Sequence, residues 1–215
     1  MSGQVGMTRS LVIGISGASG APYARRLLQV LTAPGAYPDL KVELVTSRSA
    51  AEVWKQECTG SIEDFGLKTY SGRDYSAPFA SGSAVYDAMV VVPCSMSTVA
   101  RIAQGISDDL LTRAADVVLK ERRRLVLVPR ETPYSELHLR NMLELTRLGA
   151  TIMAASPSFY GRPKNLEQVL DTVVGRLLDH LGLPSRLGPR WSAEMAAVSA
   201  EDALAGPDAG PQDEE

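Results

Sequence analysis

Five short and largely aliphatic runs recur along the chain, and a segment with helical periodicity follows each of them. Uninterrupted apolar runs of this length are typical of strands buried on both faces, as in parallel sheets. Parallel strands need a crossover connection, usually a helix, so this alternation predicts an α/β fold. The expected strands are residues 11–16, 42–46, 89–93, 125–128 and 151–155. The expected helices are residues 22–31, 48–58, 96–104, 108–124, 136–148 and 166–181.

We therefore expect a single Rossmann-like domain over residues 10–184, with a doubly wound, mostly parallel sheet and helices on both faces. The 215 residues, 45% of them hydrophobic, suffice for one well-buried core and are few for two. Residues 1–9 are expected to be a flexible N-terminus. Residues 185–215 are rich in Ala, Gly, Pro and acids, and we expect a C-terminal extension whose last part is disordered. Residues 59–86 lack clear periodicity and are expected to form a functional loop.

The charge pattern limits the partners. A formal net charge of −3 offers no basic face for nucleic acid or for an anionic membrane. No apolar run approaches the roughly 20 residues that span a bilayer, and the N-terminus lacks the order of a signal peptide. We expect a cytoplasmic protein that binds neither nucleic acid nor membrane.

Polar residues gather where the expected strands end, which is where ligands bind in an open α/β sheet. Arg130 and Glu131 follow one strand after Pro129, and Ser47 follows another directly. The other two groups are Gly17, Ala18 and Ser19 after the first strand, and Ser95, Met96, Ser97 and Thr98 after the third. Glycine turns and helix N-termini can cradle a phosphate or lie against a flat cofactor ring. The alternatives are a sharp bend that needs glycine and ordinary helix capping by serine.

The end of the second strand indicates which nucleotide fits. Dinucleotide-binding domains carry Asp or Glu there to hold the adenosine ribose. This chain has Thr46, Ser47 and Arg48 instead. The missing acid argues against NAD, Arg48 leaves NADP open, and the hydroxyls suit a mononucleotide better.

Several cationic residues are expected near the same site, and such clusters bind phosphoryl groups. Arg113 and Lys120 share one face of their helix, with Asp116 between them. Arg176 is expected on an otherwise apolar helix face, where it needs an anion or a path to water. A phosphate shared with Tyr160, which follows the last strand, would satisfy both residues. The alternative for the first pair is a surface ion-pair ladder through Asp116.

Two carboxylates and a cysteine are the remaining reactive candidates. Glu57 and Glu131 are candidates for proton transfer, with ordinary surface exposure as the alternative. Cys94 precedes a helix start that could lower its pKa, but a small residue filling a tight turn is the favoured interpretation. The two cysteines and two histidines have neither disulfide nor metal spacing, and we expect no metal site.

A set of motifs runs in order from about residue 11 to 182. They are Gly17-Ala18-Ser19-Gly20, Ser81-Gly82-Ser83, Pro93-Cys94-Ser95-Met96, Arg113 to Glu121, Val128-Pro129-Arg130-Glu131 and Phe159-Tyr160. Together they resemble the UbiX-type flavin prenyltransferases. The resemblance implies a flavin-binding domain that joins the dimethylallyl group of dimethylallyl phosphate to reduced FMN without a metal. It also implies a homo-dodecamer, whose product, prenylated FMN, serves UbiD-type decarboxylases.

The resemblance also assigns residues. The implied FMN site is lined by Gly17, Ala18, Ser19, Ser47, Ser95, Met96, Ser97, Thr98 and Arg130. The implied contacts of dimethylallyl phosphate are Tyr75, Arg113, Lys120, Tyr160 and Arg176. The implied catalytic residues are Ser19, Glu57, Lys120 and Glu131.

Two departures and two alternatives remain. Many relatives carry Trp where this chain has Tyr75, and Phe79 replaces a proline of the next motif, which leaves the donor open between monophosphate and diphosphate.

One alternative function is an FMN-dependent cysteine decarboxylase, but such enzymes typically need a histidine near the first helix, and none precedes His138. The other is a non-catalytic, flavin-carrying subunit of a decarboxylase complex. Lys120 and Glu131 argue against it, because a carrier needs neither a leaving-group clamp nor a proton relay.

Overall fold

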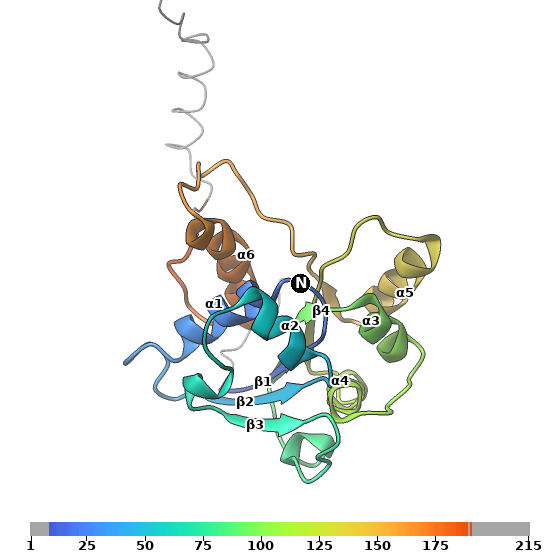
Figure 1. Ribbon diagram of the computed structural model, residues 1–215. Coiled ribbons are helices and arrows are strands. Elements are labelled where there is room, and N and C mark those ends of the chain that lie inside the picture. Colours follow the sequence, from blue (N-terminus) through green and yellow to red (C-terminus); the bar gives the residue numbers. More distant parts are fainter. Residues whose placement is uncertain (1–8, 189, 191–215) are drawn as a thin grey trace, which may run out of the picture.

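The computed structural model describes residues 9–188 and residue 190 (Figure 1). Six strands form one sheet in the order β3-β2-β1-β4-β5-β6, and every neighbouring pair is parallel. The strands are β1 Ser10–Ile15, β2 Lys41–Thr46, β3 Lys68–Ser71, β4 Ala88–Cys94, β5 Arg124–Pro129 and β6 Thr151–Ile152. The helices are α1 Ala21–Leu31, α2 Ala50–Glu57, α3 Met96–Ala103, α4 Leu110–Lys120, α5 Glu136–Arg147 and α6 Leu166–Leu181, with 3-10 turns η1 Glu63–Phe65 and η2 Pro78–Ala80.

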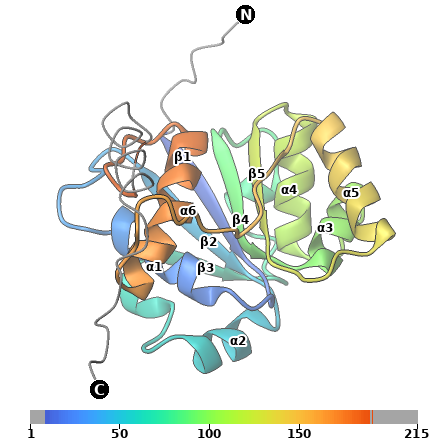
Figure 2. The same cartoon turned by 90° about the horizontal axis from the view of Figure 1, so that it is seen from above.

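Helices cover both faces of the sheet (Figure 2). The helices α1, α2 and α6 pack on one face, and α3, α4 and α5 pack on the other. Successive side chains of a strand point to opposite faces. Leu11 and Ile13 of β1 therefore pack with Leu177 of α6, whereas Val12 between them packs with Leu111 of α4. This confirms the doubly wound α/β fold.

The strand order reverses between β1 and β4. From β1 the chain continues outward through β2 and β3, and from β4 it continues the other way through β5 and β6. The connections after β1 and β4 therefore leave the carboxyl edge of the sheet in opposite directions. The crevice at such a switch point is where ligands bind in this class of fold.

The structure differs from the expectation in three elements. The strand expected over residues 151–155 is shorter, because β6 spans only Thr151–Ile152. A sixth strand, β3, lies within residues 59–86, where we expected irregular loop. Its four residues, Lys-Thr-Tyr-Ser, are too few and too polar to give a clear period. The helix expected over 108–124 is shorter, because Arg122 adopts a left-handed φ of 53° and Arg124 already begins β5.

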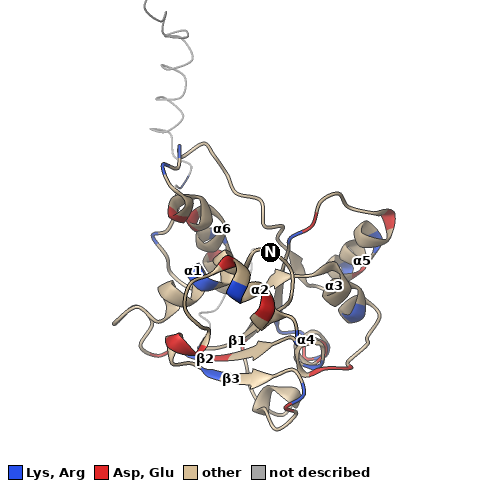
Figure 3. Cartoon of the chain, viewed as in Figure 1, with Lys and Arg blue, Asp and Glu red and all other residues tan. Residues whose placement is uncertain are grey.

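Charged residues lie outside the two central strands. Neither β1 nor β4 contains one, whereas Figure 3 shows Lys and Arg interspersed with Asp and Glu over helices and loops. None of the helices in the described part of the chain is long and apolar enough to cross a membrane. The predictions for residues 1–8 and for the tail from 191 onward lie outside the described residues.

Candidate active site

The turn between β1 and α1 is tied to β4 through Ser16. Its buried Oγ donates to the Pro93 carbonyl at 2.8 Å and accepts from the Ser95 amide at 2.8 Å. The next residue, Gly17, lies against Ser49, and a Cβ at Gly17 would stand 2.0 Å from the Ser49 Oγ. Only glycine allows the start of α2 to approach the turn this closely. These contacts fix the turn at the switch point of the sheet.

Glu57, the last residue of α2, caps the N-terminus of α1. Its Oε2 accepts from the amides of Gly20 at 2.7 Å and Ala21 at 2.8 Å. Burial raises the pKa of Glu57, but hydrogen bonds from Ser19 and the two amides, with the charge of Arg130, outweigh burial and lower it. Glu57 occupies the amides that would have cradled a phosphate. Of the two uses predicted for this turn, the structure favours contact with a flat ring.

The start of α3 carries the expected hydroxyls. The Ser95 Oγ accepts from the Thr98 amide at 3.3 Å, so ordinary capping is confirmed for Ser95. The same oxygen lies 3.0 Å from the Ser97 Oγ and 3.0 Å from the Thr98 Oγ1. Ser97 is exposed, which leaves its hydroxyl open to a ligand. Cys94 is fully buried and burial raises the pKa of its thiol, so it is the inert residue we favoured.

Ser47 is the strongest single sign of a ligand. Its amide donates to the Ile15 carbonyl at 2.9 Å, which holds it beside the end of β1. Within the described residues, the Ser47 Oγ is the only buried side-chain nitrogen or oxygen without a hydrogen-bond partner. Buried polar atoms are almost always paired, so an orphaned hydroxyl at a switch point indicates a missing partner.

Arg130 and Glu131 close the site from the end of β5. The Arg130 Nε donates to the Ser19 carbonyl at 3.0 Å, so the arginine spans the crevice from β5 to the β1–α1 turn. Glu131 is partly buried, and its Oε1 accepts from the Thr132 amide at 3.0 Å. The fold thus gathers one group of predicted residues, which we call the carboxyl-edge site. It consists of Gly17, Ala18, Ser19, Ser47, Glu57, Ser95, Met96, Ser97, Thr98, Arg130 and Glu131.

Tyr160 and Arg176 line a second hollow, a pocket of about 410 Å³ between α6 and the segments on either side of it. The expectation that Arg176 lies on an apolar helix face is wrong. Its side chain is 64% exposed, and its Nη1 pairs with Asp179 at 3.1 Å, because α6 turns its apolar residues toward the sheet and Arg176 away from it. Both residues nevertheless face one pocket, as a shared phosphate would require.

Arg113 and Lys120 lie on α4 and belong neither to the carboxyl-edge site nor to the pocket of Tyr160 and Arg176. The helix α4 runs antiparallel to the strands, since its Leu110 amide bonds Gly72 after β3, and Arg124 just beyond its end pairs with Ala88 at the start of β4. Its 11 residues span about 16 Å, which carries Lys120 to the amino edge of the sheet. A single chain therefore does not bring Lys120 to the carboxyl-edge site.

The contacts of these two cations support only half of the predicted ion-pair ladder. Arg113 pairs with Asp116 at 3.0 Å and donates to the Ala80 carbonyl at 3.0 Å. Lys120 pairs instead with its neighbour Glu121. Tyr75, in the loop after β3, is half exposed and belongs neither to the carboxyl-edge site nor to the pocket of Tyr160 and Arg176.

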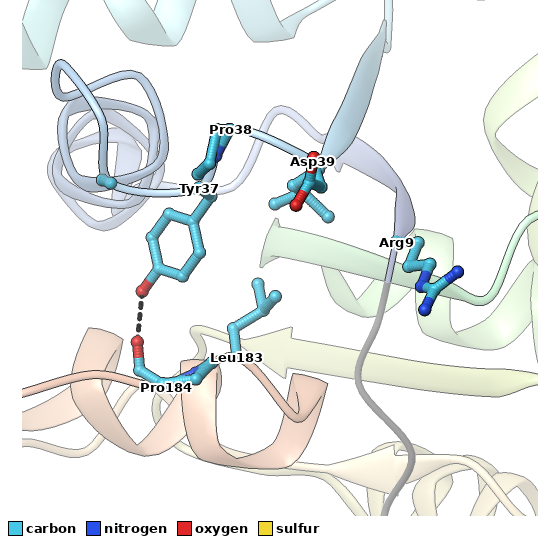
Figure 4. A pocket seen from close by; sticks show the side chains of 8 residues that line it. Arg9, Tyr37, Pro38, Asp39, Leu183 and Pro184 are labelled. Carbon is cyan, nitrogen blue, oxygen red and sulfur yellow. Dashed lines mark hydrogen bonds between the residues drawn. The ribbon is translucent and has the colours of Figure 1, made fainter.

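A larger pocket of about 570 Å³ opens at the amino ends of β1 and β2 (Figure 4). Arg9, Asp39 and Leu183 line it, and the Tyr37 hydroxyl donates to the Pro184 carbonyl across it at 2.7 Å. It contains none of the predicted site residues and lies at the opposite edge of the sheet. Its size alone does not make it the reaction site.

Comparison with known proteins agrees with this arrangement. The family model for flavoproteins matches residues 3–178. The flavin prenyltransferase UbiX of Methanocaldococcus jannaschii is 44% identical over 184 residues, which cover 84% of this chain and 97% of that protein. The chain belongs to the UbiX family of flavin prenyltransferases. The resemblance stated from the motifs is therefore confirmed.

Solved UbiX structures share the fold closely. AnUbiX (PadA1), in complex with FMN and dimethylallyl pyrophosphate, has a TM-score of 0.81 and 42% identity, covering 86% of this chain and 98% of that one. A dodecameric FMN-dependent UbiX-like decarboxylase from Escherichia coli O157:H7 has a TM-score of 0.81 and 41% identity, covering 86% and 100%.

Two polar residues of this UbiX chain escaped the sequence analysis. Asp179 and Arg190 line the pocket of Tyr160 and Arg176 and pair with each other at 2.8 Å. Asp179 lies three residues after Arg176, a helical spacing that would have predicted their pairing. Nothing in the sequence signals that Arg190 folds back onto α6.

Proposed function

We propose that this chain is a flavin prenyltransferase that joins the dimethylallyl group of dimethylallyl phosphate to reduced FMN and forms prenylated FMN. The orphaned Ser47 hydroxyl carries the cofactor part of this proposal, because it needs a polar partner at the switch point. UbiX relatives and the AnUbiX complex support the same ligands. When bound, reduced FMN supplies the nucleophilic ring atoms.

The residues of the carboxyl-edge site fit such a group. The backbone of the β1–α1 turn at Gly17 and Ala18 can lie against a flat ring, and its close approach to Ser49 at the start of α2 fixes the turn in place. The hydroxyl of Ser97 and the positive end of α3 suit a phosphate. Arg130 lies across the turn, where its guanidinium can pair with an anion.

The donor phosphate needs a clamp of fixed positive charge. As the allylic carbon–oxygen bond breaks, the bonding electrons leave with the phosphate, and charges already in place stabilise it without rearrangement. Arg176 provides part of that charge from the pocket it shares with Tyr160, whose hydroxyl can donate a hydrogen bond to the phosphate. Holding the donor against the acceptor also removes the entropy cost of their encounter.

Arg113 and Lys120 would complete the clamp from a neighbouring copy of the chain. Their place on α4 separates Lys120 from the carboxyl-edge site of its own chain, whereas an assembly can bring it to another. A homo-dodecamer is supported by the dodecameric UbiX-like protein of the same fold. Tyr75 would approach the donor in the same way.

The carboxylates of Glu131 and Glu57 are the groups that can transfer protons. Joining the dimethylallyl group through two bonds releases a proton, and Glu131, oriented by the Thr132 amide, can accept it directly or through Ser19. Hydrogen bonds and the charge of Arg130 lower the pKa of Glu57 below an ordinary value that is already acidic, so Glu57 is ionised at neutral pH. Its bonds to the α1 amides make it an organiser of the Ser19 turn as well.

The two alternatives have weaker support. A cysteine decarboxylase would lack its usual histidine, and a carrier subunit would not need Glu131. Delivery of the product to a UbiD-type decarboxylase and a cytoplasmic location remain predictions. The first is tested by activating such a decarboxylase with the purified product, and the second by cell fractionation.

Phosphate release tests the proposed function. Purified chain is incubated anaerobically with dimethylallyl phosphate, with and without reduced FMN, and inorganic phosphate is measured. We expect release that depends on reduced FMN and falls at least about a hundredfold in Glu131→Gln, a loss typical of a removed general base. Release without FMN would indicate simple hydrolysis, and no release with FMN would contradict the proposal.

A further inference from the structure

The chain folds back onto α6 after the helix ends, and Gly175 is what allows it. A Cβ at Gly175 would stand 2.4 Å from the Leu187 carbonyl oxygen, closer than any side chain permits. On the same path, Gly188 has a φ of 68° and lies against the backbone of Asp171. Residues 185–188 and 190 therefore form a return segment along the outer side of α6.

This return segment brings a second arginine to the pocket of Tyr160. The Arg190 Nη2 donates to the Asp179 Oδ1 at 2.8 Å and to the Ser185 carbonyl at 2.9 Å, and its Nη1 donates to the Asp179 Oδ2 at 3.2 Å. Asp179 also accepts from the Arg176 Nη1 at 3.1 Å. One carboxylate thus holds two guanidinium groups side by side.

We propose that Arg190 is a second phosphate-binding arginine of the donor site, and that Asp179 holds it beside Arg176 for this purpose. This inference rests on the proposed function. The charged residues lining the pocket are Arg176, Arg190 and Asp179, so its lining keeps one net positive charge after pairing. A phosphate ester carries more negative charge than a carboxylate does, and two guanidinium forks can bind it through several N–H donors.

The position of Arg190 suits ligand binding better than fold stability. Its side chain is 57% exposed, so its pair with Asp179 contributes little to stability. The pocket of about 410 Å³ also includes Thr172, whose Oγ1 accepts from the Ser158 amide at 3.2 Å, and this bond holds the chain before Tyr160 against α6. A phosphate here would lie between Tyr160, Arg176 and Arg190.

Donor kinetics and phosphate binding test this assignment. In Arg190→Ala we expect the KM for dimethylallyl phosphate to rise at least about tenfold, as loss of a charge-assisted hydrogen bond predicts. Calorimetry with inorganic phosphate should show a similar weakening, while the Kd for FMN stays unchanged. Arg190→Lys, which keeps the charge without the fork, should recover part of the loss. Arg186→Ala, an exposed arginine on the same return segment, is the matched control and should match the unaltered chain.

The outcomes separate this inference from the proposed function. If Arg176→Ala raises the donor KM and Arg190→Ala does not, the inference about Arg190 is wrong and the donor site stands. If neither variant changes donor KM or phosphate affinity, the placement of the donor phosphate in this pocket is wrong. An equal effect in Arg186→Ala would also overturn the assignment, because it would reduce Arg190 to general surface charge.

Discussion

At the scale of single residues, Glu57 combines a structural and a chemical role. Its carboxylate accepts hydrogen bonds from the amides of Gly20 and Ala21 at the start of α1. Amides at a helix N-terminus otherwise have no partner within the helix. An acid at this position also interacts favourably with the helix dipole. Both effects are stronger for the ionised form, so Glu57 should make folding depend on pH.

We expect Glu57→Gln to remove that dependence. Because the folded state lowers the pKa of Glu57 below its ordinary value of 4.5, the stabilisation is complete above that value and is lost as pH falls through the folded-state pKa. The free energy of unfolding should differ between the two proteins by about 0.3–1 kcal/mol at pH 7, because Gln keeps an acceptor oxygen and loses only the charge, and the difference should shrink below about pH 4.5. Urea unfolding at several pH values measures this. A difference that stays constant down to pH 3 would contradict the capping role.

Ser47 and Ser95 should respond differently to the same change. Ser47→Ala removes an unpaired hydroxyl, so stability without ligand should hold, while the Kd for FMN should rise about fivefold if the hydroxyl bonds the cofactor. Ser95→Ala removes a helix cap and should cost about 1 kcal/mol of stability. Thermal unfolding and fluorescence titration with FMN measure both quantities. Unchanged FMN affinity in Ser47→Ala would remove Ser47 from the site.

At the scale of elements, a buried carboxylate explains the short strand β3. Glu43 of β2 is 4% exposed, and its two oxygens accept from the hydroxyls of Tyr70 on β3, at 3.3 Å, and of Tyr86 before β4. The Phe79 ring packs edge-to-face against both tyrosines, with centroids 5.2 and 5.7 Å apart. Lys41, whose side chain is exposed, pairs with Glu43 at a distance of 3.2 Å. This cluster anchors β3 and the loop that follows η2.

Replacing Glu43 should test whether the cluster holds that region. Glu43→Leu leaves two buried tyrosine hydroxyls without an acceptor and should lower the free energy of unfolding by about 1–3 kcal/mol. Combining it with Tyr86→Phe should restore part of the loss, because no donor then remains unpaired at that position. Denaturant unfolding at one fixed protein concentration compares the variants. If the double variant is less stable than Glu43→Leu, the cluster does not act through these bonds.

Sequence patterns predicted the elements whose burial is strong and failed where contacts are long-range. The five apolar strands and the polar residues at their ends follow from short-range patterns in the sequence. The strand β3 has no such period, because it depends on the contact of Tyr70 with Glu43, a residue 27 positions away. The cap of α1 by Glu57 spans 37 positions, and no local pattern signals it. The outward direction of Arg176 depends on how α6 is rotated against the sheet, and its proximity in sequence to Val173, Val174 and Leu177 led to the wrong face being predicted.

At the scale of the whole molecule, the sheet separates the predicted donor contact Lys120 from the carboxyl-edge site of the same chain. Lys120 lies at the amino edge, and the carboxyl-edge site lies at the other. If neighbouring copies complete each site, two inactive variants should complement each other when assembled together. Lys120→Met and Glu131→Gln, each nearly inactive alone, should regain activity on co-expression, since some sites then receive an unaltered residue from each copy. Absence of any recovery in verified mixed assemblies would place Lys120 outside the site.

The most direct measurement is the mass of the flavin after a single anaerobic incubation. The purified chain is mixed with reduced FMN and dimethylallyl phosphate, without added metal, and the released flavin is analysed by mass spectrometry. The account predicts that FMN gains one C5H8 unit, and that Glu131→Gln binds FMN without forming this product. Unchanged FMN with both the monophosphate and the diphosphate donor would contradict prenyl transfer by this chain.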